Sequence, residues 1–178
     1  MRELCRPAMQ RLAVNSAETV YLVQRSGLEA VCIDFQQGPD TLRVVTLQMG
    51  SRRPLGLGAG GLAILAAMNA DDIEEVLKVV MPSIETEWRF PQAELRASMA
   101  QAQQQGYAVI KNRITPGVTA FGKAFKDSLG QVFGAVTIAG LNSRMTPSRM
   151  AVLVNGLERA TSTIEKALRS HQWARHAP

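Results

Sequence analysis

The chain has 178 residues, 46% of them hydrophobic and 20% charged, and it carries a net charge of +5. This length suits one domain with a substantial core. No apolar run is long enough to span a membrane, and residues 1–7 lack the apolar core of a secretion signal. Two cysteines, Cys5 and Cys32, fit a reducing compartment, so we expect a cytoplasmic protein with no membrane partner.

The sequence offers little that could carry catalysis. The two histidines stand at positions 171 and 176, and no serine follows the Gly-x-Ser-x-Gly pattern of a nucleophile elbow. No cluster has the ligand spacing of a zinc or calcium site. We therefore predict no enzyme activity, no metal and no cofactor. The excess of basic residues late in the chain lacks interleaved aromatic residues, which favours a solvated helix face over a nucleic-acid surface.

The first part of the chain predicts a helix followed by strands. Apolar residues at three- and four-residue spacing indicate a helix over residues 3–15. Residues 19–25 and 30–35 are typical of strands, and the Ser26-Gly27 turn between them predicts a hairpin. A third strand is expected over residues 41–47, after a Gly-Pro-Asp turn.

Residues 50–67 combine an extended piece around Pro54, a glycine-rich bend and most of an apolar helix that we expect over residues 58–68. A helix that begins after such a bend leaves backbone N–H groups unpaired, and these can hold an anion. The alternative interpretation is close packing, because glycines allow a helix to approach a sheet tightly. The two interpretations are compatible, and no Gly-Lys-Ser/Thr of a P-loop follows.

The second half repeats the order of helices, strands and a final helix. A helix over residues 72–80 is expected to end at Met81-Pro82, with a loop over 83–90 that carries Trp88. Pro91 suits the first position of the next helix, and Gly106 suits its end. Three strands and a helix capped by Thr146 follow, over residues 107–110, 118–125, 132–139 and 147–169. Sequential triplets of strands favour an α+β domain with an antiparallel sheet of about six strands.

The ordered segments resemble the C-terminal effector-binding domain of IclR-family bacterial transcriptional regulators. The resemblance covers most of the chain and is carried by residues 18–22 (ETVYL), 50–55 (GSRRPL), 59–63 (AGGLA), 106–109 (GYAV), 116–120 (PGVTA), 134–140 (GAVTIAG) and 143–146 (SRMT). It implies a GAF-like (profilin-like) fold, with a curved antiparallel sheet and a small-molecule pocket. Residues 1–170 would form the effector-binding domain, and 171–178 a disordered tail.

The resemblance also implies partners. Family members bind operator DNA through an N-terminal winged helix-turn-helix domain that is absent from this chain, and they form dimers or tetramers. Two alternatives are a GAF-like sensor module of another signalling protein and a small enzyme with a donor-poor pocket. A winged helix upstream would distinguish the first alternative, and turnover of a bound compound would favour the second.

The family's pocket positions fall on nine residues of this chain: Leu42, Val45, Arg53, Ala59, Gly60, Ile110, Ala120, Thr137 and Ala139. The resemblance implies that the amides of Ala59 and Gly60 receive a carboxylate. Where members that bind small keto acids have Asp, Cys and two Ser, this chain has Ile110, Ala120, Thr137 and Ala139. Because unpaired polar oxygens are costly to bury, we expect a larger, mostly apolar acid, for example an aromatic one. Arg53 would pair with it or would be an ordinary surface arginine.

Overall fold

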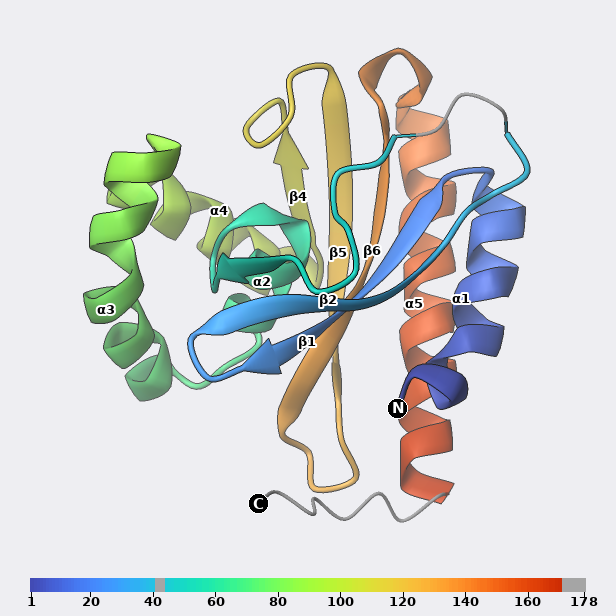
Figure 1. Cartoon of the computed structure of the whole chain (residues 1–178), viewed down its shortest axis with the longest axis horizontal. Helices are drawn as coiled ribbons and strands as arrows, with labels where there is room; N and C mark the ends of the chain where they lie inside the picture. The colour runs from blue at the N-terminus through green and yellow to red at the C-terminus, as the bar shows by residue number, and fades with distance from the viewer. Residues whose placement is uncertain (41–43, 171–178) are drawn as a thin grey trace.

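A computed structural model describes residues 1–40 and 44–170 (Figure 1). The helices are α1 (Arg2–Ser16), α2 (Gly58–Ala66), α3 (Ala70–Trp88), α4 (Gln92–Gln105), a short 3-10 helix η1 (Asn142–Arg144) and α5 (Pro147–Ser170). The strands are β1 (Thr19–Ser26), β2 (Glu29–Gln36), β3 (Arg52–Pro54), β4 (Ala108–Lys111), β5 (Val118–Lys126) and β6 (Val132–Leu141). The predicted tail, 171–178, lies outside the described residues.

The six strands form one antiparallel sheet in the order β3-β2-β1-β6-β5-β4. The β1–β2 hairpin and the β5–β6 hairpin meet at the centre, where Val20 pairs with Ile138 and Val23 with Ala135. The α+β class and the antiparallel sheet are therefore confirmed. Gly106 ends α4 with φ 80°, a backbone conformation that glycine adopts without strain.

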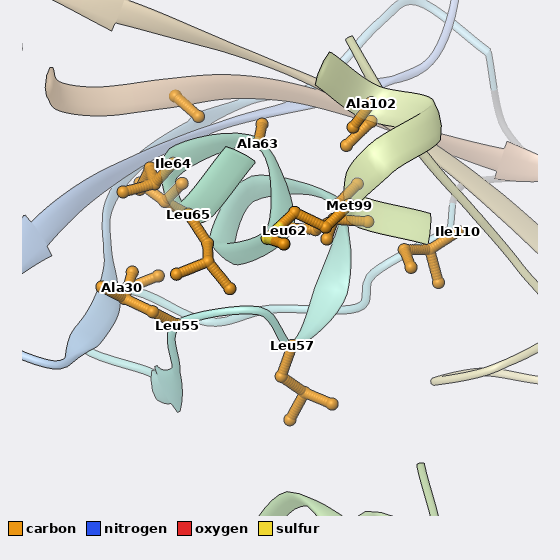
Figure 2. Packing of buried hydrophobic residues seen from close by; sticks show 14 of the residues in the cluster. Ala30, Leu55, Leu57, Leu62, Ala63, Ile64, Leu65, Met99, Ala102 and Ile110 are labelled. Carbon is orange, nitrogen blue, oxygen red and sulfur yellow. The ribbon is translucent and has the colours of Figure 1, made fainter. Parts of the chain in front are cut away.

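Helices cover both faces of the sheet, and successive side chains of β1 point alternately into the two helical layers. Val20 and Leu22 of β1 face the layer of α1 and α5, whereas Tyr21 and Val23 face the layer of α2, α3 and α4. Figure 1 shows α3 at the far end of the molecule from α1 and α5. In Figure 2, the α2 side chain Leu62 lies beside Met99 of α4, and both belong to the core between the sheet and helices α2, α3 and α4.

The third strand is not where the sequence predicts it. Residues 41–43 lie outside the described part of the chain, and 44–48 have no strand conformation. The third strand is β3, in which Arg53 pairs with Ala30 of β2. Segment 44–48 cannot take that edge, because the backbone of Ser51 and Gly50 already bonds to Cys32 of β2.

The predicted end of α3 at Pro82 and the loop after it are also wrong. The helix continues through Pro82 to Trp88, and Arg89 ends it with φ 49°. A proline removes one helical hydrogen bond, but the apolar stripe extends past it to Ile84, which is fully buried. Packing of that stripe outweighs the local signal. Pro91 precedes α4 as its N-cap and is not its first helical residue.

Candidate functional site

The N-terminus of α2 lies directly against the sheet, and two glycines make this approach possible. A Cβ atom on Gly60 would lie 2.5 Å from Cγ2 of Val23, and one on Gly122 of β5 would lie 2.3 Å from the carbonyl oxygen of Ala59. A larger residue at Gly122 would require the helix to move, and one at Gly60 would displace the helix or the Val23 side chain. The close-packing interpretation of the glycine-rich bend is therefore confirmed.

A cavity of about 50 Å³ lies where this helix start meets the sheet. One water molecule needs about 10–15 Å³ on this measure, so the cavity holds a few waters or a small organic acid. Its walls come from all six strands of the sheet, the α2 N-terminus and the two connections 46–51 and 114–115. The lining residues are Val23, Ala30, Cys32, Thr46, Leu47, Ser51, Arg53, Leu57, Gly58, Ala59, Gly60, Gly61, Ile110, Ile114, Thr115, Val118, Ala120, Thr137 and Ala139.

Seven of the nine residues predicted for the pocket line this cavity: Arg53, Ala59, Gly60, Ile110, Ala120, Thr137 and Ala139. Strand register explains part of this grouping, because Ala120 on β5 pairs with both Ile110 on β4 and Ala139 on β6. Val45 does not line the cavity, and its side chain is 59% exposed. Leu42 lies outside the described residues.

Sequence reasoning missed the wall that β2 contributes. Ala30 and Cys32 are buried, whereas Val31 between them is more exposed. Residues two apart on a strand share one face, but residues 30–33 are all apolar, so the sequence does not show which of them face the cavity. The contribution of Thr46 and Leu47 had no signal either, because this part of the chain follows neither a strand nor a helix.

The start of α2 supplies a partial positive charge to the cavity. Its N-cap, Leu57, makes no side-chain capping bond, and the first turn contains no acidic residue. The first amides of a helix have no partner within the helix, and the helix dipole adds to their positive potential. Gly58, Ala59 and Gly60 all line the cavity, so this end of α2 favours an anion.

Arg53 brings a full positive charge to the same wall. Its Nη2 donates to the carbonyl oxygen of Thr46 at 2.9 Å, and its guanidinium carbon lies 5.6 Å from the centre of the Trp88 ring. Burial lowers the pKa of the guanidinium, which reflects the cost of removing this charge from water. Within residues 1–40 and 44–170, no carboxylate forms an ion pair with Arg53.

The Cys32 thiol is the other reactive group in the wall. Burial raises its pKa to about 11, so it is a neutral thiol at pH 7. A neutral thiol is a poor nucleophile and a poor metal ligand.

No group of three or more His, Cys, Asp or Glu side chains is arranged to hold a metal ion in the described part of the chain. The same residues include no helix that could cross a bilayer.

Comparison with known proteins identifies the family. Residues 1–166 match the family model for the bacterial transcriptional regulator IclR C-terminal domain. The chain belongs to the IclR family. Its relatives are transcriptional regulators and not enzymes, which agrees with the prediction of no enzyme activity.

Individual relatives support this assignment. The HTH-type transcriptional repressor AllR of Klebsiella pneumoniae is 31% identical over 144 residues, which cover 80% of this chain and 53% of that protein. The regulator KipR of Bacillus subtilis is 27% identical over 169 residues, 94% of this chain and 67% of that protein. The chain thus spans about half the length of the AllR relatives that it matches.

Solved structures of the family share the fold. Thermotoga maritima IclR superposes with a TM-score of 0.84 at 24% identity, covering 94% of this chain and 68% of that one. The C-terminal domain of the Escherichia coli regulator KdgR gives a TM-score of 0.78 at 19% identity, with 94% and 98% of the two chains covered. At these identities the likeness concerns the fold alone.

Proposed function

We propose that residues 1–170 form the effector-binding domain of an IclR-type regulator, and that the effector is a carboxylic acid bound in the cavity at the start of α2. The observation that carries this proposal is the Arg53 guanidinium, which lines the cavity beside a helix N-terminus and has no carboxylate partner in the described residues. A carboxylate placed between them would accept bonds from the amides of Ala59 and Gly60 and from Arg53.

The remaining walls favour an apolar body for this acid. Besides the charged groups, the lining includes the apolar side chains of Val23, Ala30, Ile110, Ala120 and Ala139. Hydroxyl or keto oxygens placed there would lose their hydrogen bonds to water, at about 1–3 kcal/mol each. An aromatic acid fits this chemistry, although a ring needs more room than the present 50 Å³. Binding of such a ligand therefore requires the cavity wall to move.

The proposed output is control of DNA binding. The names of AllR and KipR describe HTH-type regulators that are longer than this chain. We propose that a winged helix-turn-helix domain outside residues 1–178 binds DNA. We also propose that the effector-binding domain, residues 1–170, assembles as a dimer or tetramer. The ligand would stabilise one arrangement of the domains over another.

The test is a thermal-shift screen followed by calorimetry, with benzoate, benzyl alcohol and pyruvate as probes. A ligand at a hundred times its dissociation constant adds about 2.7 kcal/mol to the free energy of unfolding, a shift of several degrees. We expect benzoate to stabilise the domain and benzyl alcohol not to. The variant Arg53→Met should weaken benzoate binding at least about tenfold, because a charge-assisted hydrogen bond contributes about 1.5–3 kcal/mol.

Two results would contradict the proposal. Equal stabilisation by benzyl alcohol and benzoate would exclude an anion site. Stabilisation by pyruvate alone would exclude the apolar body of the ligand. The variant Arg52→Met is a matched control, because Arg52 precedes Arg53 on β3 but bonds to the exposed Glu29 and does not line the cavity. It should bind every probe as the wild type does.

A further inference from the structure

The outer wall of the cavity is a segment without strand or helix conformation. Hydrogen bonds from side chains hold it in place. Thr46 and Leu47 line the cavity, and Figure 1 shows the chain from residue 44 to β3 crossing the face of the sheet. Val44 is buried, and Leu47 packs on the same core. Residues 44–48 of this connection are described below as the cover segment.

One hydroxyl group makes two of the hydrogen bonds that hold the cover segment. The Tyr21 hydroxyl donates to the carbonyl oxygen of Val44 at 3.1 Å and accepts from the amide of Thr46 at 2.9 Å. Its ring is 1% exposed and lies 6.3 Å from the ring of Phe35. The hydroxyl is therefore held in place by the sheet, and its proton and one of its lone pairs bond to the cover segment.

Arg53 completes the attachment, since its Nη2 donates to the carbonyl oxygen of Thr46 at 2.9 Å. Both polar groups of the Thr46 backbone are thus bound by side chains, the amide by Tyr21 and the carbonyl by Arg53. The guanidinium has five N–H donors, so Arg53 can keep this bond while it also binds a carboxylate. Closure over a ligand and contact with that ligand are compatible.

We propose that Tyr21 is a positioning residue whose two hydrogen bonds, to Val44 and Thr46, form a latch that holds the cover segment over the ligand cavity. The ligand enters when these hydrogen bonds break. The inference rests on the proposed function for the nature of the guest. The latch itself is tested without a ligand, because the cavity contains its own reporter. Cys32 lines the cavity and is 1% exposed, so a thiol reagent reaches it only when the cavity opens.

The second cysteine provides an internal control. Cys5 is completely buried in the other core, on the opposite face of the sheet. Opening of the cover segment therefore exposes Cys32 alone, whereas global unfolding exposes both thiols. Tyr107 provides a matched variant, because it is the second of the two tyrosines in the chain and lies outside the cavity lining.

The experiment compares iodoacetamide labelling of Cys32 and Cys5, peptide by peptide, in the wild type, Tyr21→Phe and Tyr107→Phe. Each hydrogen bond ordinarily changes an equilibrium by a factor of about 2 to 10. We expect Tyr21→Phe to label Cys32 about tenfold faster, with Cys5 unchanged and both rates unchanged in Tyr107→Phe. A Cys32 rate within twofold of the wild type, or equal acceleration of both cysteines, would overturn the latch.

A measurement on the wild type covers the case in which Tyr21→Phe does not fold. The amide of Thr46 is bonded to the Tyr21 hydroxyl, so its hydrogen exchange should report the same opening as Cys32 labelling. We expect the two opening constants to agree within about threefold, and exchange of Thr46 at the rate of an open coil would overturn the latch. Benzoate binding is scored separately: its absence with a working latch refutes the proposed ligand alone.

Discussion

Replacing Gly122 by alanine tests the contact on which the cavity depends. The added Cβ would lie 2.3 Å from the carbonyl oxygen and 2.6 Å from the carbonyl carbon of Ala59. Both atoms belong to the backbone of α2, so no side chain can rotate away. Restoring ordinary contact requires α2 to retreat from the sheet by about 1 Å.

The expected cost is large for one methyl group. Overpacking a well-packed core costs about 1–3 kcal/mol, and a clash with backbone belongs at the upper end. A loss of about 3 kcal/mol in a domain of this size lowers the melting temperature by about 6–12 °C. Urea denaturation followed by circular dichroism should show a lower midpoint at an unchanged m-value.

Gly156→Ala is the control for this substitution. Its added Cβ would lie 2.8 Å from Cδ1 of Leu12, the flexible end of a side chain. Alanine also gains about 1 kcal/mol of helix propensity within α5, which offsets the cost of moving Leu12. We expect a change below about 1 kcal/mol. The reasoning would be refuted if Gly122→Ala were as stable as Gly156→Ala.

Two further predictions concern buried ionisable groups. Burial raises the pKa of Cys32 from 9.0 to about 11 and that of Cys5 to about 12. Because the unfolded thiols ionise first, the free energy of unfolding should fall as the pH rises from 9 to 11, and an equal slope in the double alanine variant would contradict this. Glu18, 3% exposed and 2.9 Å from Arg149, should cost about 3 kcal/mol on replacement by alanine. The exposed Glu29 should cost below about 1 kcal/mol, and equal midpoints in urea would disprove the difference.

Local sequence patterns predicted the helices and strands correctly where the tertiary packing favours the same structure. The apolar run of β1, the final glycine of α4 and the apolar stripe of α5 each indicate the observed structure. Residues 41–47 have a strand-like composition as well, but a strand needs a free edge, and β3 with its preceding turn occupies the edge of β2. Such competition between two segments for one edge is decided by tertiary contacts that a local pattern does not contain.

The cavity could also be predicted only where local sequence features form it. The glycine-rich bend indicated the helix start at Ala59 and Gly60, because a bend followed by a helix is a local feature, whereas Arg53 was assigned through the resemblance to the IclR family. The Tyr21 latch had no comparable signal. Its partners are backbone groups of Val44 and Thr46, more than twenty positions away in the chain, and any residue except proline would offer the same N–H and C=O groups.

The two interpretations of the glycine-rich bend are compatible with one physical arrangement. An anion site needs helix amides that face a cavity away from bulk water, and such burial requires the helix to touch the sheet. Gly60 and Gly122 permit that contact at distances no side chain allows. The packing interpretation therefore supplies the geometry that the anion interpretation requires. It follows that Gly122→Ala should weaken benzoate binding more than its effect on stability alone explains, since it displaces the amides of Ala59 and Gly60 from Arg53.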